Sequence, residues 1–376
     1  MTPIYLDHNA STPVAPAVLE EMLPWLTGSG ANPSADHAPG RRARHAIERA
    51  RAQVSQLLDC TPEQVVFTSG GTESNNMAIL GSARAAPADR RQIVTTAVEH
   101  PAVLRPCAAL QKEGFRIDRA AVGSDGTIDV DAVRAMMGPQ TALVTAMLAN
   151  NETGALLPVG PLAEAAHDCG AWVHTDAAQA VGKVPVSVRT LGVDLLTVAG
   201  HKLYAPKGVG ALVVGDIPLA PILFGATHER GLRPGTANVP AIVGLGAACV
   251  LAGQGLAEEA ERQNQLRELL WRTLSATIPR LRRTVAGPGS LPNTLHVMAP
   301  GLSGTAILVG APEVAASTGS ACHSGRETPS AVLVQMGITP ELALGALRLS
   351  LGRTTTAEDV AHAAAHIARA ANALRP

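Results

Sequence analysis

The chain has 376 residues, and its 30 Lys and Arg nearly balance its 31 Asp and Glu, which leaves a formal net charge of -1. Aromatic residues make up only 2% of the chain, so the composition disfavours a nucleic-acid binder, which would need basic surface or stacking rings. Hydrophobic residues make up 46%, which excludes intrinsic disorder. The length predicts two domains, with one large α/β unit as the alternative.

Taken in chain order, the N-terminal residues lack the basic and apolar regions of an export signal, so we expect no secretion. Between residues 64 and 215, short β-branched runs alternate with helical runs such as 101–113 and 161–169. This alternation predicts a mostly parallel sheet covered on both faces, with functional groups at the carboxyl ends of its strands. The expected strands are 64–68, 92–96, 141–149, 172–175, 194–198 and 210–214.

Residues 239–257 contain no charged side chain over about the length of a bilayer span. Their Gly and Ala content, Pro240 and the charged run that follows favour a buried helix instead. After about residue 255 the pattern changes to a charged helix at 258–277, short strands near 293–298 and 348–351, and a final helix. Thr356 and Asp359 have the spacing of a capping box at the start of that helix. This part is predicted to be a smaller α+β domain.

The cysteines are odd in number, far apart, and include no C-x-x-C pair, so neither a disulfide framework nor a metal site is predicted. His362 and His366 are one helical turn apart, but no third ligand lies near them in the sequence. Free thiols in a reducing cytoplasm fit best, and a buried structural thiol is the default expectation for each cysteine. The five are Cys60, Cys107, Cys169, Cys249 and Cys322.

A possible phosphate site lies where the apolar run at 65–68 leads through Gly70 and Gly71 into Thr72 and Glu73. We expect Thr72 to cap a helix that begins at Glu73, and the N–H groups at a helix start suit a phosphate. The spacing matches neither dinucleotide-binding nor P-loop fingerprints. Taken alone, an ordinary turn between a strand and a helix explains the segment equally well.

Two later strand ends carry polar residues. Asp176 and Gln179 follow the strand at 172–175, where a carboxylate could face a cationic ring nitrogen or could simply cap the next helix. Lys202, beside His201 after the strand at 194–198, could be a partly desolvated amine that forms imines. Lysines at strand ends are usually solvated, so this signal is also only suggestive by itself.

Together, these strand ends supply an imine-forming lysine, a partner for a pyridinium nitrogen, a ring-stacking group and a phosphate site. Pyridoxal 5'-phosphate needs all four, and no purely structural explanation accounts for their joint occurrence. In chain order the groups are Gly71 and Thr72, His100, residues 150–154, Asp176 and Gln179, and Lys202.

The sequence resembles the class V aminotransferase group of fold-type I pyridoxal-phosphate enzymes, and within it the cysteine desulfurases and selenocysteine lyases. The resemblance extends from residues 6–7 to 347–353. It implies an α/β fold with a large cofactor-binding domain at 15–255, built on a mostly parallel seven-stranded sheet. Residues 1–14 and 256–376 would form the smaller α+β domain. The most specific matching segments are 68–74, 98–100, 150–154, 174–179, 200–202, 233–236 and 319–322.

The resemblance also implies roles around the cofactor ring. Lys202 would bind the cofactor covalently and later shuttle a proton. His100 would stack on the ring and assist proton transfer, and Asp176 would keep the ring nitrogen protonated. Gln179 would bond to the phenolic oxygen.

At the other end of the cofactor, the resemblance implies that the phosphate binds Gly71, Thr72 and His201. Thr236 would reach the phosphate from the partner subunit of a homodimer. The protein would therefore need a second copy of itself to complete each site.

For the substrate, the resemblance implies that Arg348 pairs bidentately with the carboxylate, helped by Asn32 and by Asn151, which would also touch the cofactor. Cys322 lies in a run of small residues at 315–325 that has little to bury. We therefore predict a mobile loop on which the Cys322 thiolate attacks the substrate sulfur and leaves as a persulfide. His323 could aid thiolate formation or simply be exposed.

Three functions follow as hypotheses. The first is a cysteine desulfurase that converts L-cysteine to L-alanine and passes sulfur to a protein acceptor, such as an iron-sulfur scaffold or a thiolation protein. The second is a selenocysteine lyase: Ala199 stands where most similar desulfurases have a phosphate-binding serine, and the lyases also lack that hydroxyl. The third is a non-catalytic scaffold, which the intact chemical positions disfavour. No nucleic-acid, membrane or metal partner is expected.

Overall fold

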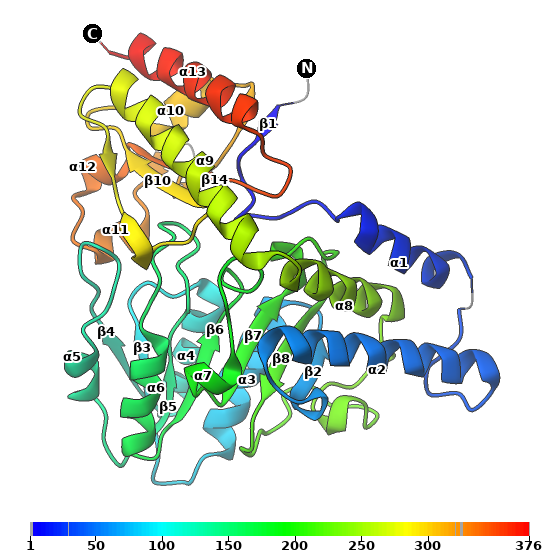
Figure 1. The fold of residues 1–376 in the computed structure, drawn as a ribbon. Helices are drawn as coiled ribbons and strands as arrows, with labels where there is room; N and C mark the ends of the chain where they lie inside the picture. The colour runs from blue at the N-terminus through cyan, green and yellow to red at the C-terminus, as the bar shows by residue number, and fades with distance from the viewer. Residues whose placement is uncertain (1–2, 29, 320, 324–325, 376) are drawn as a thin grey trace.

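A computed structural model describes residues 3–28, 30–319, 321–323 and 326–375. Its larger part is built on a seven-stranded sheet with the order β2-β8-β7-β6-β5-β3-β4 (Figure 1). Only β8 runs antiparallel to its neighbours, so the predicted mostly parallel sheet is confirmed. The strands are β2 (Val65–Thr68), β3 (Gln92–Thr96), β4 (Arg116–Ala120), β5 (Thr141–Thr145), β6 (Trp172–Asp176), β7 (Leu195–Ala199) and β8 (Gly210–Val214).

Strands β2, β3, β5, β7 and β8 are buried along their whole length, as expected for a sheet with helices on both faces. The strand predicted over 141–149 ends earlier, at Thr145. β4 is absent from the predicted strands because it is an edge strand in which Arg116, Asp118 and Arg119 interrupt the apolar pattern. The helices of this part are α1 (Pro16–Thr27), α2 (Ala38–Leu58), α3 (Gly71–Ala85), α4 (Pro101–Lys112), α5 (Val130–Arg134), α6 (Val159–Asp168), α7 (Val188–Leu191) and α8 (Val239–Gly253).

The uncharged stretch forms the largely buried helix α8, as predicted, and α8 packs closely on α2. Gly246 makes this possible, because a Cβ there would come within 2.7 Å of the Ala50 Cα. In the described part of the chain, no single helix is long and apolar enough to cross a membrane. Helix α8 and the next helix, α9, have the length and composition of a membrane span only when they are taken together, and the chain bends by 75° between them.

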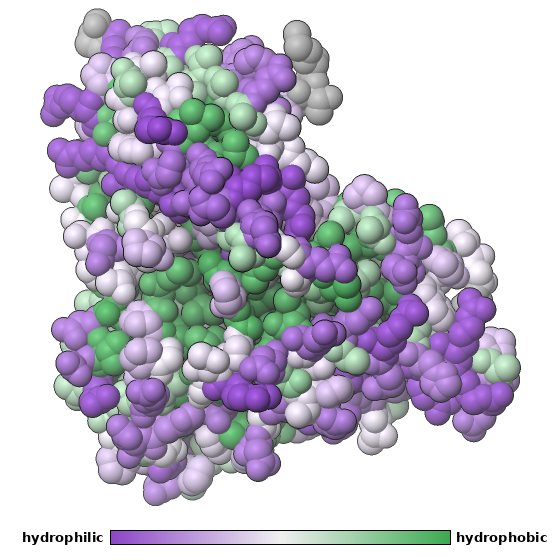
Figure 2. Space-filling model, in the orientation of Figure 1, coloured by the Kyte–Doolittle hydropathy of each residue, from purple (hydrophilic) through white to green (hydrophobic). Residues whose placement is uncertain are grey.

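The smaller part contains a three-stranded antiparallel sheet, β14-β10-β9, packed against α9 and α13. As predicted, Thr356 and Asp359 form a capping box at the start of α13. The elements are α9 (Leu256–Thr277), β9 (Arg282–Arg283), β10 (Thr294–Met298), α10 (Gly304–Val309), β11 (Val314–Ala315), β12 (Ala321–His323), β13 (Arg326–Thr328), α11 (Ala331–Gln335), α12 (Pro340–Ala343), β14 (Ala346–Ser350) and α13 (Ala357–Ala373). Figure 2 shows polar side chains along α9 and apolar ones gathered between α9 and α2.

The N-terminal segment joins the two parts. Its strand β1 (Ile4–Tyr5) pairs with β11 of the smaller part, and Figure 1 shows it beside α13. The segment then crosses to the larger part, where the Thr12 N–H donates to the His201 carbonyl oxygen at 2.9 Å. Leu6 belongs to the apolar core of α9, β10, β14 and α13, which is separate from the core of the large sheet. This division supports the domain boundaries near residues 14 and 255, which stay a prediction.

Candidate active site

A cavity of about 360 Å³ lies where β6 and β7 end, and it faces β14 of the smaller part. The structure brings many of the residues predicted from the sequence to its wall: Gly71, Thr72, His100, Asn151, Asp176, Gln179, His201, Lys202 and Arg348. The lining also includes residues that the sequence analysis missed, among them Asn9, Ala10, Asn75 and Met147. The strand-end argument therefore located the site, while the N-terminal segment and the second layer around Asp176 carried no recognisable motif.

Lys202 ends a short 3-10 turn (Gly200–Lys202) directly after β7. Its Nζ donates to the main-chain oxygens of Asn9 at 2.6 Å and Ala10 at 2.8 Å. Burial, followed by the charge of Arg348, lowers the pKa of Lys202 to about 8, so a large share of the amine is neutral near that pH. The acceptors are main-chain carbonyl groups, which every residue carries, so no sequence motif marks them.

Asp176 is the last residue of β6, and both of its carboxylate oxygens are bonded. Oδ2 accepts from Asn75 Nδ2 at 2.7 Å, and Oδ1 accepts from the Ala178 N–H at 3.0 Å. The second bond is the local turn that the capping hypothesis expected, yet the same side chain also lines the cavity. Two hydrogen bonds therefore orient the carboxylate on the cavity wall, which suits the predicted partner of a cationic ring nitrogen.

His100 caps α4, and its Nδ1 accepts from the Ala102 N–H at 3.1 Å. This bond assigns the ring proton to Nε2 in the neutral imidazole. Burial lowers the pKa of His100, and the charge of Lys202 lowers it further, although Asp176 opposes the shift. A neutral imidazole on the cavity wall suits the predicted stacking on a flat ring.

The start of helix α3, where the sequence predicts the phosphate site, differs from the prediction. α3 begins at Gly71, so Thr72 lies inside its first turn and does not cap it. Gly70 precedes the helix at a φ of 143°, which a side chain would disfavour, and this allows the chain to turn earlier. His201 lies close by as a neutral ring, because burial and then Lys202 lower its pKa to about 4. The wall here also includes Ala199.

Arg348 on β14 lines the cavity on the side of the smaller part. Its Nη2 donates to Asp7 Oδ1 at 2.7 Å, and its Nη1 donates to the main-chain oxygen of Asn151 at 3.1 Å. Nε is buried without a hydrogen-bond partner among the described residues. A guanidinium fixed on one side, with donors remaining, suits bidentate binding of a carboxylate.

Two predicted residues, Asn32 and Thr236, do not line this cavity, and for a third, Cys322, the side chain is not described. Asn32 is exposed, and its Oδ1 accepts from the Ser34 N–H at 2.9 Å. Thr236 is exposed on the loop before α8. For Cys322 the structure describes the backbone, which pairs with Glu327 in a hairpin of β12 and β13. Its side chain and that of His323 lie outside the described residues.

The other four cysteines, Cys60, Cys107, Cys169 and Cys249, are free thiols, and each is at least half-buried. Burial raises the pKa of Cys60 to about 11 and those of Cys107 and Cys249 to about 12. These three thiols are therefore unreactive at neutral pH, as expected for structural cysteines.

The donor set fits the cofactor that the sequence predicts. A carboxylate, an amine, a neutral imidazole and a helix start surround one cavity, in the arrangement needed by a flat molecule with a cationic nitrogen and a phosphate. Gly71 leaves space at the phosphate end, because a Cβ there would come within 3.2 Å of the Ala199 Cβ. The fold and cavity thus define an α/β protein with a lysine-centred site at the carboxyl edge of its sheet.

The chain belongs to the aminotransferase class-V family, whose model matches residues 4–362. A protein of Frankia sp. (strain EuIK1), named cysteine desulfurase, is 45% identical, with 98% of this chain and 91% of that protein covered. A solved structure described as a NifS-like protein has a TM-score of 0.93 at 34% identity, covering 99% of this chain and 100% of the other. Another, described as SspA in complex with cysteine, has a TM-score of 0.82 at 35% identity, covering 92% and 98%.

Proposed function

We propose that this protein is a pyridoxal-phosphate-dependent cysteine desulfurase, which converts L-cysteine to L-alanine and passes the sulfur, as a persulfide on Cys322, to a protein acceptor. The observation that carries the proposal is that Lys202, Asp176 and Arg348 line one cavity. The name of the Frankia relative supports sulfur chemistry, and the SspA structure was solved with cysteine. The free thiols suit a reducing compartment such as the cytoplasm.

When bound, the cofactor would supply an electron sink that stabilises negative charge on the substrate carbon. Asp176 would keep the ring nitrogen protonated, and Gln179 would donate from Nε2 to the phenolic oxygen. His100 would lie against the ring. The phosphate would be held by Gly71, Thr72 and His201.

The substrate carboxylate would bind Arg348, whose orientation is set by Asp7 and by the Asn151 carbonyl. Lys202 would hold and move a proton at Nζ. The Cys322 thiolate would form a bond to the substrate sulfur as the carbon–sulfur bond breaks. The carbon retains that electron pair and takes up a proton, so alanine forms without an external oxidant.

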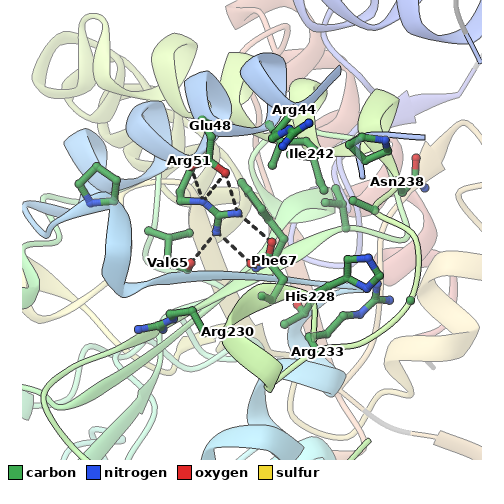
Figure 3. Close-up of a pocket in the computed structure, with 18 of the residues that line it drawn as sticks. Arg44, Glu48, Arg51, Val65, Phe67, His228, Arg230, Arg233, Asn238 and Ile242 are labelled. Atoms are coloured by element: carbon green, nitrogen blue, oxygen red, sulfur yellow. Dashed lines mark hydrogen bonds and ion pairs between the residues drawn. The ribbon is translucent and has the colours of Figure 1, made fainter. Parts of the chain in front are cut away.

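We also infer that two copies assemble, with Thr236 of each reaching the other's cavity. The loop before α8 is held to its own chain by Glu229, whose carboxylate binds Arg51 at 2.8 and 2.9 Å and the Phe67 N–H at 2.8 Å (Figure 3). Beyond this anchor Thr236 is exposed, and the Phe224 side chain is 86% exposed. A rigid loop that presents an apolar ring and a hydroxyl suits insertion into a partner.

The activity is tested with purified protein and L-cysteine, measuring alanine and persulfide. We expect Lys202→Ala to lose the visible absorbance of the lysine-bound cofactor. Cys322→Ala should keep that absorbance but lose sulfur transfer, while the matched control Cys60→Ala behaves as wild type. Full cysteine turnover in Cys322→Ala, or a wild type that takes up no cofactor, would refute the proposal. Faster turnover of L-selenocysteine that persists in Cys322→Ala would favour the lyase.

The assembly is tested by mixing subunits. Lys202→Ala and Thr236→Val are each expected to be impaired alone. A mixed dimer contains one cavity with both native residues, so unfolding and refolding the mixture should restore part of the activity. A monomer in sedimentation at micromolar concentration, or no recovery in the mixture, would contradict a shared site.

A further inference from the structure

Lys183 is a buried lysine that none of the roles above uses. It follows β6, is 8% exposed, and is absent from the wall of the 360 Å³ cavity. Its Nζ donates to Gln179 Oε1 at 2.6 Å and to Asn9 Oδ1 at 3.0 Å. Among the described residues, no carboxylate lies within ion-pair distance of it. Burying an amine away from any carboxylate costs free energy, which its two hydrogen bonds to amide oxygens offset in part.

Gln179 is the residue through which Lys183 reaches the cavity. The Gln179 amide has an oxygen side and an NH₂ side, and it lies one helical turn's spacing from Lys183. Nζ donates to the oxygen side of the amide, so the amide oxygen faces Lys183. The NH₂ group is thereby directed to the other side, where Nε2 donates to the Asn9 carbonyl oxygen at 2.9 Å and still has one N–H for the cavity.

The same lysine stabilises the segment that holds Lys202. Asn9 Oδ1 accepts from Lys183 and from Asn293 Nδ2 at 3.0 Å, while the Asn9 main-chain oxygen accepts from Lys202 Nζ at 2.6 Å. Burial, and then the charges of Lys202 and Arg348, lower the pKa of Lys183 well below its ordinary value. His8, Tyr204 and Arg353 line a small cavity together with Lys183, and the pKa of His8 is lowered to about 4 by burial and then by Lys183.

We propose that Lys183 is a positioning residue that fixes the Gln179 amide with its N–H groups toward the cavity, so that the site donates to the anionic phenolic oxygen of the cofactor. This rests on the proposed function. Without Lys183 only the Asn9 carbonyl oxygen would hold the amide, which could then rotate and place its own oxygen against that anionic oxygen. The phenolic oxygen would then lose a donor, become more basic, and hold the neighbouring proton of the chromophore more tightly.

The test compares Lys183→Met, Gln179→Leu and the double variant, as holoenzymes without substrate. The readouts are the pKa of the bound chromophore, from absorbance against pH, and the dissociation constant of pyridoxal phosphate. We expect Lys183→Met to raise the chromophore pKa by about one unit and to weaken cofactor binding several-fold. Gln179→Leu should do the same, and the double variant should shift no further, because both act through one hydrogen bond. Lys112→Met, at an exposed lysine of α4, is the matched control.

Wild-type values in Lys183→Met, or a double variant in which the two shifts add, would overturn the proposal while leaving the desulfurase assignment intact. A wild type without a chromophore would instead refute the proposed function. Should Lys183→Met fail to fold, Lys183→Gln replaces it, since a glutamine can present either its oxygen or its NH₂ and does not force the Gln179 orientation. A raised chromophore pKa is expected there too, and an unshifted one would also overturn the proposal.

Discussion

Asp7 and Arg348, which are 341 positions apart in the chain, form an ion pair of 2.7 Å at the edge of the cavity that faces the smaller part. Both side chains are largely shielded from solvent, at 20% and 10% exposure. The second oxygen of Asp7 accepts from Ser317 Oγ at 2.9 Å, at the start of the segment that leads to Cys322. One carboxylate therefore orients the guanidinium and also holds the beginning of the segment that would carry the sulfur acceptor.

Replacing Asp7 by Asn should weaken substrate binding. The guanidinium keeps its bond to the Asn151 carbonyl but loses its charged partner, so its remaining donors are aimed less precisely at the substrate carboxylate. We expect KM for L-cysteine to rise about tenfold, equivalent to about 1.4 kcal/mol, with kcat changed by less than about threefold. Ser317→Ala, which leaves the ion pair in place, is the control. A lower KM in Asp7→Asn would mean that Asp7 competes with the substrate for Arg348.

The sequence located the site because its side chains follow apolar strands, whose carboxyl ends meet at one edge of a parallel sheet. Asp176 and Lys202 are recognisable in this way. Asp7 and Asn9 are not, because they precede the first long helix and reach the cavity only when the N-terminal segment crosses between the two parts. The early start of α3 depends on the positive φ of Gly70. A glycine can adopt this φ but does not have to, so the sequence alone does not place the helix start.

The lowered pKa of Lys202 predicts how the protein without cofactor takes up pyridoxal phosphate. Only the neutral amine can attack the aldehyde, and the pKa falls from 10.5 to about 8. The rate of uptake should therefore rise with pH and level off above about pH 8. Because the charge of Arg348 contributes to the shift, Arg348→Met should move the midpoint to higher pH, whereas Arg369→Met at an exposed site should not. If the uptake rate of the wild type instead has its midpoint near pH 10, the pKa of Lys202 is not lowered.

Glu99 predicts a pH dependence of stability. It is fully buried beside His100, and burial raises its pKa to about 8, despite hydrogen bonds from the Met147 N–H and Thr96 Oγ1 that oppose the shift. Its Oε2 is buried without a hydrogen-bond partner among the described residues. Because the folded-state pKa lies above the unfolded value of 4.5, the folded protein binds more protons between these limits. The contribution of Glu99 to stability should therefore fall as pH rises from about 4.5 to 8.

Glu99→Gln removes this titration and keeps an oxygen acceptor. We expect the free energy of unfolding of the wild type to fall relative to the variant by up to about 1.4 kcal/mol per pH unit across that range. Urea unfolding of the protein without cofactor at pH 5.5, 6.5 and 7.5 measures the difference. Glu358→Gln, at an exposed position of α13, should run parallel to the wild type. If the free energy of unfolding of Glu99→Gln also runs parallel to that of the wild type from pH 5.5 to 7.5, Glu99 is ionised over this whole range.

Ala199 stands where the resemblance implies a phosphate-binding serine, and this position predicts a gain of affinity on substitution. Ala199 ends β7 and lines the cavity beside Gly71 and His201. In Ala199→Ser the added hydroxyl could donate to the cofactor phosphate, and a hydrogen bond to a charged group contributes about 1.5 kcal/mol. We expect the dissociation constant of pyridoxal phosphate to fall about tenfold. Ala178→Ser adds the same hydroxyl elsewhere on the cavity wall and should not tighten binding. Weaker binding in Ala199→Ser would contradict this prediction. It would indicate that the added hydroxyl is forced against Gly71 and that only a small side chain fits at position 199.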